Sequence, residues 1–176
     1  AQVWEARNVA ARVRNLVFVS VSDGIGVGVV VNGELLRGRH NIAGEFAHMP
    51  LNVDGPRCSC GAIGCWEAHI SNLATLTRYF GRPQERTSGD HAFTIDNLIA
   101  RARSGDGKAA AALQASARYL GLGLGGIVNI IDPDCIFIGG EITTAWDLIE
   151  SSVRTALAER ALSPAAASTD IVIVSA

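Results

Sequence analysis

Three strand-like segments joined by tight turns lie near the start of the chain, a pattern that few folds accommodate. Residues 15–22 are rich in β-branched side chains and almost continuously apolar, which predicts a central strand. A glycine-containing turn follows, and residues 27–31 predict the returning strand. Asn32-Gly33 is a two-residue hairpin signal, and it precedes a short strand over residues 34–36. The sequence therefore predicts a β-meander.

The rest of the chain alternates between helical and strand-like patterns. Residues 37–64 are irregular and rich in Gly, Pro and Cys. Apolar spacing predicts helices over residues 2–14, 66–80, 93–103, 108–131 and 143–161, and strands over residues 135–138 and 171–174. We expect an α/β fold in which the meander is followed by α-β crossovers.

Composition narrows the class of protein. The 176 residues are 48% hydrophobic and 18% charged, which is enough apolar side chain for a sizeable core. The net charge is −2 without a basic run, so DNA binding is expected only outside this segment. There is no membrane-length apolar stretch and no signal peptide, which predicts a cytoplasmic protein. The chain lacks an initiating Met and ends in a strand without an onward connection, so we expect it to be truncated at both ends.

Three cysteines crowd into one short segment of the irregular region. Cys58, Cys60 and Cys65 follow His48 in the pattern H-x9-C-x-C-x4-C. Three thiolates and one imidazole complete a tetrahedral zinc shell and leave no open position for water, which predicts a structural metal site. The alternative is a set of reduced cysteines with an unrelated histidine nearby. Cys135 lies in an apolar strand and is expected in the core.

The other three histidines are not part of a comparable cluster of ligand residues in the sequence. His40, His69 and His91 are each expected to be surface or packing residues.

The segments Gly44-Glu-Phe-Ala-His48 and Cys58-Ser-Cys-Gly-Ala-Ile-Gly-Cys-Trp-Glu67 resemble the signature of the ROK family (repressors, open reading frames and sugar kinases). The usual form is G-E-x-G-H followed by C-x-C-G-x-x-G-C-x-E. The similarity extends to the glycine turn, the Asn-Gly hairpin, Asn129-x-x-Asp-Pro133 and Gly139-Gly140. One departure is Ala47, where many members have Gly.

The resemblance implies an actin-like, ribonuclease-H-type fold of two lobes. Residues 1–176 would be mainly the C-terminal lobe, without the N-terminal lobe or any DNA-binding domain. His48, Cys58, Cys60 and Cys65 would hold zinc, and Glu45, His48 and Glu67 would face a sugar. A carboxylate accepts hydrogen bonds from two adjacent sugar hydroxyls, and a metal-bound histidine keeps its second ring nitrogen as a donor.

Each glutamate also has a simpler interpretation. The alternative for Glu45 is a side chain exposed to solvent. The alternative for Glu67 is that it caps the helix that begins near Trp66, where the helix dipole favours an early acidic residue.

Kinases of the family phosphorylate sugars with ATP, using a catalytic Asp in the N-terminal lobe. Their phosphate-binding turn usually reads T-x-G-T-G-x-G, and the matching stretch is residues 20–26, with Asp23 in the usual threonine position. A carboxylate beside phosphates weakens binding by like-charge repulsion unless Mg²⁺ compensates. In a kinase, the nucleotide would be contacted by Gly24, Gly26, Gly139 and Gly140. The turn resembles the repressor branch more closely, although a hairpin kept tight for packing suits either branch.

A second glycine pattern, Gly121-x-Gly-x-x-Gly126 with Glu141 further on, imitates a dinucleotide fingerprint. Such a fingerprint must follow a strand and open a helix, whereas here a long predicted helix runs into the glycines. Close helix packing is the better interpretation.

The sequence thus favours the sugar-sensing domain of a ROK-type transcriptional regulator, with no catalytic residue in this chain. DNA would be bound by a helix-turn-helix outside it. The alternative is an ATP- and Mg²⁺-dependent sugar kinase, and a third possibility is a binding module that has lost both activities. Dimers are common in the family, and the helix over residues 108–131 is either a candidate dimer surface or core.

Overall fold

The computed structural model of the chain describes residues 13–84 and 93–174. Residues 2–12 of the first predicted helix, and His91, lie outside this part of the chain. The elements are, in order, β1 (Leu16–Val21), β2 (Ile25–Val31), β3 (Glu34–Leu35), η1 (Phe46–His48), α2 (Glu67–Ile70), α3 (Asn72–Phe80), α4 (Ile95–Arg103), α5 (Gly107–Ile131), β4 (Cys135–Gly139), η2 (Glu141–Ala145), α6 (Trp146–Arg160), α7 (Pro164–Ala167) and β5 (Asp170–Ile173).

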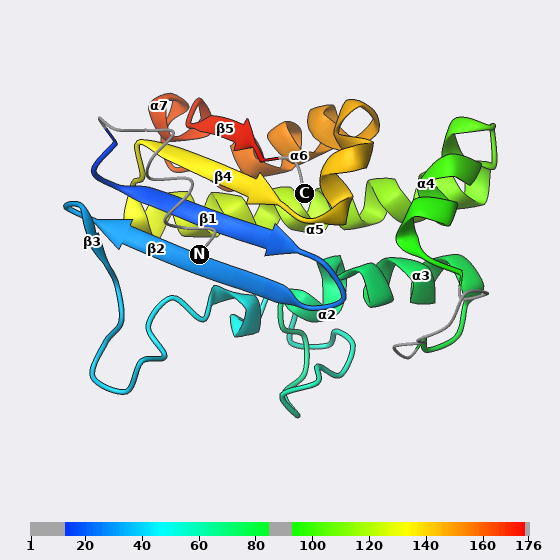
Figure 1. Ribbon diagram of the computed structural model, residues 1–176, viewed down its shortest axis with the longest axis horizontal. Helices are drawn as coiled ribbons and strands as arrows, with labels where there is room; N and C mark the ends of the chain where they lie inside the picture. The colour runs from blue at the N-terminus through cyan, green and yellow to red at the C-terminus, as the bar shows by residue number, and fades with distance from the viewer. Residues whose placement is uncertain (1–12, 85–92, 175–176) are drawn as a thin grey trace.

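The strands form one five-stranded mixed sheet in the order β3-β2-β1-β4-β5 (Figure 1). β1 pairs antiparallel with β2, and β2 with β3, which confirms the predicted meander. β4 pairs parallel with β1, and β5 with β4, which confirms the crossovers. Asn32 and Gly33 form the hairpin turn with φ of 54° and 83°, a conformation that favours these two residue types.

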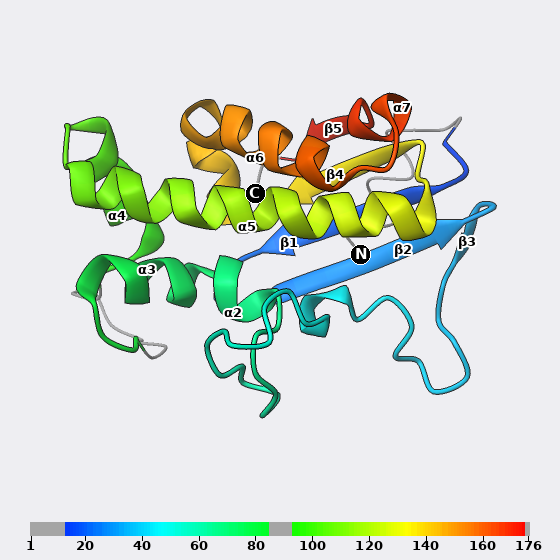
Figure 2. The ribbon, with the colours of Figure 1, turned by 180° about the vertical axis from the view of Figure 1, so that it is seen from behind.

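Helices α5 and α6 cover one face of the sheet, as the view from behind shows (Figure 2). The side chains of β1 alternate between the two faces of the sheet, as the two-residue period of a strand requires. Val17, Val19 and Val21 join the main core with the helices, whereas Leu16 and Phe18 join a second cluster on the opposite face with Val30, Cys135 and Phe137. Cys135 is buried, as predicted.

The glycines of α5 make close packing possible. A Cβ at Gly121 would lie 2.2 Å from the Val153 carbonyl oxygen of α6, and one at Gly123 would lie 2.2 Å from the indole ring of Trp66. Trp66 is fully buried, and its indole N–H donates to the Tyr119 carbonyl oxygen at 2.9 Å. The glycines are therefore packing residues within a helix, as predicted, and α5 is a core helix.

Two predicted helices differ in detail. The helix expected over residues 66–80 is two helices, because Ser71 is extended and caps α3 by accepting a hydrogen bond from the Ala74 N–H. The helix expected from Thr143 begins as the 3-10 segment η2 and becomes α-helical only at Trp146.

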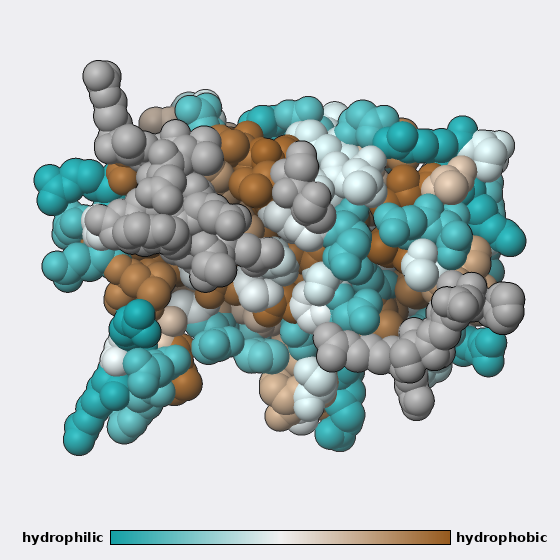
Figure 3. All heavy atoms as spheres, in the orientation of Figure 1, coloured by the Kyte–Doolittle hydropathy of each residue, from teal (hydrophilic) through white to brown (hydrophobic). Residues whose placement is uncertain are grey.

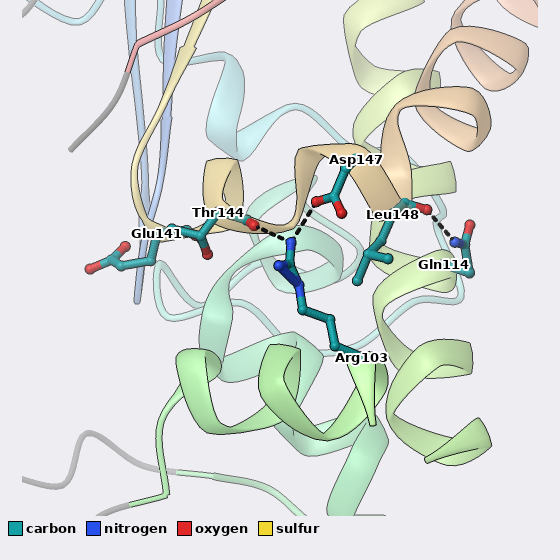
Figure 4. A network of polar contacts seen from close by, with 6 residues as sticks. All are labelled: Arg103, Gln114, Glu141, Thr144, Asp147 and Leu148. Atoms are coloured by element: carbon teal, nitrogen blue, oxygen red, sulfur yellow. Dashed lines mark hydrogen bonds and ion pairs between the residues drawn. The ribbon is translucent and has the colours of Figure 1, made fainter. Parts of the chain in front are cut away.

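Polar contacts fix η2 and the start of α6 against the neighbouring helices (Figure 4). Arg103 of α4 donates to the Thr144 carbonyl oxygen at 2.9 Å and pairs with Asp147 at 2.6 Å. Gln114 of α5 donates to the Leu148 carbonyl oxygen at 2.7 Å. These contacts hold the segment that follows β4 in place.

The surface gives two further observations. The loop after β3 projects below the sheet and is largely hydrophilic on the face shown in Figure 3, where residues 37–41 are exposed. None of the helices in the described part of the chain is long and apolar enough to cross a lipid bilayer.

We predict that Gly121→Ala lowers the free energy of unfolding by about 1–3 kcal/mol, because the new methyl group must displace the backbone of α6. Gly107→Ala, at the first residue of the same helix, is the matched control, since its Cβ would meet nothing within 4 Å. Urea titration followed by circular dichroism measures both values. Equal stabilities for the two variants would contradict the close packing.

Candidate metal centre and adjoining carboxylate

The structure brings the four predicted metal ligands together. One ligand atom from each of His48, Cys58, Cys60 and Cys65 lies within 4.8 Å of every other. His48 Nδ1 is 3.6 Å from Cys58 Sγ, and the Sγ atoms of Cys60 and Cys65 are 3.7 Å apart. Cys58 and Cys65 are buried, and Cys60 is exposed.

Two short pairings fold the loop into this shape. Isolated β-bridges join Pro50 to Cys65 and Arg57 to Ile63, so the chain doubles back on itself. Gly64 has a φ of 75°, and a Cβ there would lie 1.6 Å from the Asn52 carbonyl oxygen. A side chain at this position would therefore open the loop.

Two of the separations between ligand atoms match those of a tetrahedral metal ion. Zinc–sulfur bonds of about 2.3 Å and zinc–nitrogen bonds of about 2.0 Å place two sulfurs about 3.8 Å apart, and a sulfur and a nitrogen about 3.5 Å apart. Both measured separations are close to these values. The cluster could hold a metal ion, and its donor set is the one that zinc prefers.

The three thiols of the cluster differ in the direction of their pKa shifts. Burial raises the pKa of Cys65 to about 12, and burial also raises the pKa of Cys58. A hydrogen bond from the Ala62 backbone lowers the pKa of Cys60. A metal ion must displace the thiol protons, and it does so against the raised pKa values of Cys58 and Cys65, so metal binding strengthens as the pH rises.

The Glu67 carboxylate joins this loop to the turn between β1 and β2. The Ile25 N–H donates to Glu67 Oε2 at 3.0 Å, and Ser59 Oγ donates to Oε1 at 2.8 Å. Cys58 Sγ lies 3.5 Å from the same Oε1. Burial alone would raise the pKa of Glu67, but these hydrogen bonds outweigh it and the pKa is lowered.

The predicted glutamates therefore occupy different settings. Glu67 is the acidic residue in the first turn of α2, as the alternative expected, and its two oxygens also accept hydrogen bonds from the turn and the loop. Glu45 is exposed, and its side chain makes no capping bond to η1. Its carbonyl oxygen accepts the His48 N–H at 3.1 Å, so its backbone helps to position that ligand.

The two glycine turns lie side by side where β1 and β4 end. The parallel register pairs Ser20 with Gly139, and Gly140 follows with a φ of 91°. A Cβ at Gly140 would lie 2.1 Å from the Val21 carbonyl oxygen, so this glycine is required for the close approach of the two strand ends. Open α/β sheets bind ligands beyond such carboxyl ends.

Two backbone N–H groups of the turn between β1 and β2 are already hydrogen-bonded within the protein. The Ser22 N–H donates to the Gly24 carbonyl oxygen at 3.0 Å, and the Ile25 N–H is taken by Glu67. A Cβ at Gly24 would lie 3.2 Å from Glu67 Oε2, so this glycine lets the carboxylate reach the turn, whereas a Cβ at Gly26 would have no neighbour nearer than 3.9 Å. Asp23 is exposed at the tip of the turn.

Three polar residues near these features were missed by sequence reasoning. They are Ser59, Asn72 and Glu141. Asn72 Nδ2 donates to Glu141 Oε2 at 3.3 Å, and the Asn72 N–H donates to the Ser22 carbonyl oxygen at 2.8 Å. The position of Ser59 between two predicted ligands was the one available signal. Two of the remaining histidines lie in the described part of the chain and agree with the prediction, since His40 is exposed and His69 is buried against Tyr119.

The fold is that of the ROK actin-like sugar kinases and their relatives. A ROK hexokinase from Thermus thermophilus superposes with a TM-score of 0.75 at 29% identity, over 93% of this chain and 53% of that chain. A ROK family transcriptional regulator, a homologue of the E. coli MLC protein, superposes with a TM-score of 0.79 at 29% identity, over 96% of this chain and 44% of that one.

The sequence comparisons agree with the fold. The ROK family profile matches residues 1–176. The chain is 33% identical to the xylose repressor of Bacillus subtilis (strain 168) over 85% of its own length and 37% of the repressor. The chain belongs to the ROK family, and it spans well under half of the length of this curated relative.

We predict that Cys60→Ser reduces bound zinc from one ion per chain to a small fraction of that, because three remaining ligands no longer close the tetrahedron. Cys135→Ala is the matched control, because this thiol lies in β4 outside the cluster. Elemental analysis after dialysis measures the metal. Full zinc content in Cys60→Ser would argue against the site.

Proposed function

We propose that this chain is the sugar-binding part of a ROK-family transcriptional regulator, in which zinc holds the recognition loop and sugar occupancy alters DNA binding by a domain outside the chain. The chain would be mainly the C-terminal lobe of that protein. The similarity to the xylose repressor supports this reading. A sugar or sugar phosphate would bind between the lobes and change their closure or the dimer geometry.

The carbohydrate side of the site would be formed by Glu45, His48 and Glu67. Glu67 is held by donors on both of its oxygens and is ionised, so it can accept hydrogen bonds from sugar hydroxyls. Nδ1 is the ring nitrogen of His48 near Cys58, which leaves Nε2 as a donor toward a ligand. Zinc supplies no chemistry in this arrangement beyond fixing the loop.

The observation that carries the choice of regulator over kinase is Asp23 in the β1–β2 turn, where kinases of the family usually have threonine, beside an Ile25 N–H that already donates to Glu67. A phosphate-binding turn works because its backbone N–H groups are free to face the phosphates. Here one such group already serves a carboxylate, and Asp23 adds a second negative charge at the tip of the turn. Like charges at this point weaken triphosphate binding.

A sugar kinase is the second candidate. It is favoured by the adjacent glycine turns at the ends of β1 and β4, and by the similarity to the ROK hexokinase. In that case Mg²⁺ would offset Asp23, and the Gly24 and Gly140 regions would flank ATP.

Calorimetric titration of the zinc-loaded, full-length protein with Mg·ATP separates the two candidates. We expect no heat of binding up to millimolar ATP, because of the occupied amide and the charge at the turn. Metal analysis and circular dichroism on the same sample show that the protein is folded. Millimolar or tighter binding, together with ATP-dependent phosphorylation of a hexose, would establish the kinase instead.

We also predict that Glu67→Gln weakens sugar binding about ten- to hundredfold while leaving zinc in place, because the amide offers one acceptor where the carboxylate offers two. Glu34→Gln, on the exposed strand β3, is the control and should bind sugar normally. Titration with D-xylose and D-glucose, with metal analysis alongside, gives both readouts. Loss of zinc from Glu67→Gln would mean that this residue supports the metal rather than the sugar.

A further inference from the structure

The hydrogen bonds of the Glu67 carboxylate divide between its two oxygens. Oε2 accepts the Ile25 N–H of the β1–β2 turn, and Oε1 accepts the Ser59 hydroxyl of the metal-binding loop. The terminal torsion of a glutamate is broad, so a donor on one oxygen alone leaves the carboxylate free to swing about its own axis. Donors on both oxygens, from two separate segments, fix its plane.

Ser59 has a role that Cys58 cannot take over. Cys58 Sγ also lies within 3.5 Å of Oε1, but a cysteine that coordinates a metal ion is a thiolate without a proton to donate. Cys58 belongs to the ligand cluster. Ser59 is a neutral donor whose hydroxyl lies 2.8 Å from Oε1, well inside its 3.8 Å separation from Cys58 Sγ.

The same arrangement limits what the carboxylate can bind. An ionised carboxylate has about four acceptor positions, two on each oxygen. Ser59 and Ile25 each fill one position, and Cys58 Sγ lies 3.5 Å from Oε1. A metal-bound Cys58 has no proton to donate, so one acceptor position is left on each oxygen. Two acceptor positions on the two oxygens of one carboxylate match two hydroxyls on adjacent carbons of a ligand.

We propose that Ser59 is a positioning residue that orients Glu67 for binding of a vicinal diol. The inference rests on the proposed function, since it assigns Glu67 to the sugar. Ser59 does not touch the ligand itself and is not a metal ligand. It acts by holding in the unbound protein the carboxylate plane that the ligand requires, which lowers the ordering cost of binding.

The test measures the affinity of zinc-loaded, full-length protein for D-xylose and D-glucose by calorimetry. Ser59→Ala should weaken the binding about three- to tenfold, and Ser59→Thr, which keeps the hydroxyl, should restore it. Arg57→Ala is the matched control in the same loop, because Arg57 donates to the Gly61 carbonyl oxygen at 3.4 Å and does not contact Glu67. It should bind sugar like the unaltered protein, and all variants should keep their zinc.

A double-mutant cycle shows whether Ser59 acts through Glu67. In the Glu67→Gln background, Ser59→Ala should have little further effect, whereas a residue with an independent structural role would weaken binding by the same factor in both backgrounds. Unchanged affinity of Ser59→Ala, loss of its zinc, or failure of Ser59→Thr to restore binding would overturn the positioning role while leaving the proposed function intact. Absence of sugar binding in the unaltered protein would overturn both.

Discussion

The placement of Trp66 against α5 determines where the metal-binding loop and the Glu67 carboxylate lie. The indole is fully buried and bonded to the Tyr119 carbonyl oxygen, and it packs where any Cβ at Gly123 would collide with it. Cys65 precedes Trp66 in the chain and Glu67 follows it, so one apolar anchor sets the position of a metal ligand and of a polar recognition group together. A large buried aromatic ring has a fixed position in the core, and it fixes the ends of the surface loop attached to it.

The turn between β1 and β2 illustrates how backbone donors are distributed in this lobe. The N–H groups of Ser22 and Ile25 are satisfied inside the protein, by Gly24 and by Glu67, and the Ser22 carbonyl oxygen accepts the N–H of Asn72. Through these hydrogen bonds the turn connects the sheet to Glu67 at the start of α2 and to Asn72 at the start of α3. The hydrogen bond from the Ile25 N–H to Glu67 would have to break before this N–H could donate to a bound anion.

The meander was predictable because its signals are local: Asn32-Gly33 alone dictates the hairpin. The glycines of α5 were correctly interpreted for the same reason, since a helical pattern leads into them. Ser71 was missed because apolar spacing continues across it, although serine is a favourable N-cap. The ligand cluster followed from spacing, whereas the contact between Glu67 and Ile25 joins residues 42 positions apart and depends on how Trp66 is seated. No local pattern carries that information.

The parallel pairing of β1 with β4 has a consequence for synthesis of the chain. The whole helical segment from α2 to α5 lies between these neighbours, whereas the metal ligands fall within residues 48–65 (Figure 1). As the chain emerges from the ribosome, the metal-binding loop is complete long before β4 exists. Until then β1, a largely apolar strand, has an open edge of unpaired backbone groups, which is the kind of surface on which nascent chains aggregate and chaperones act.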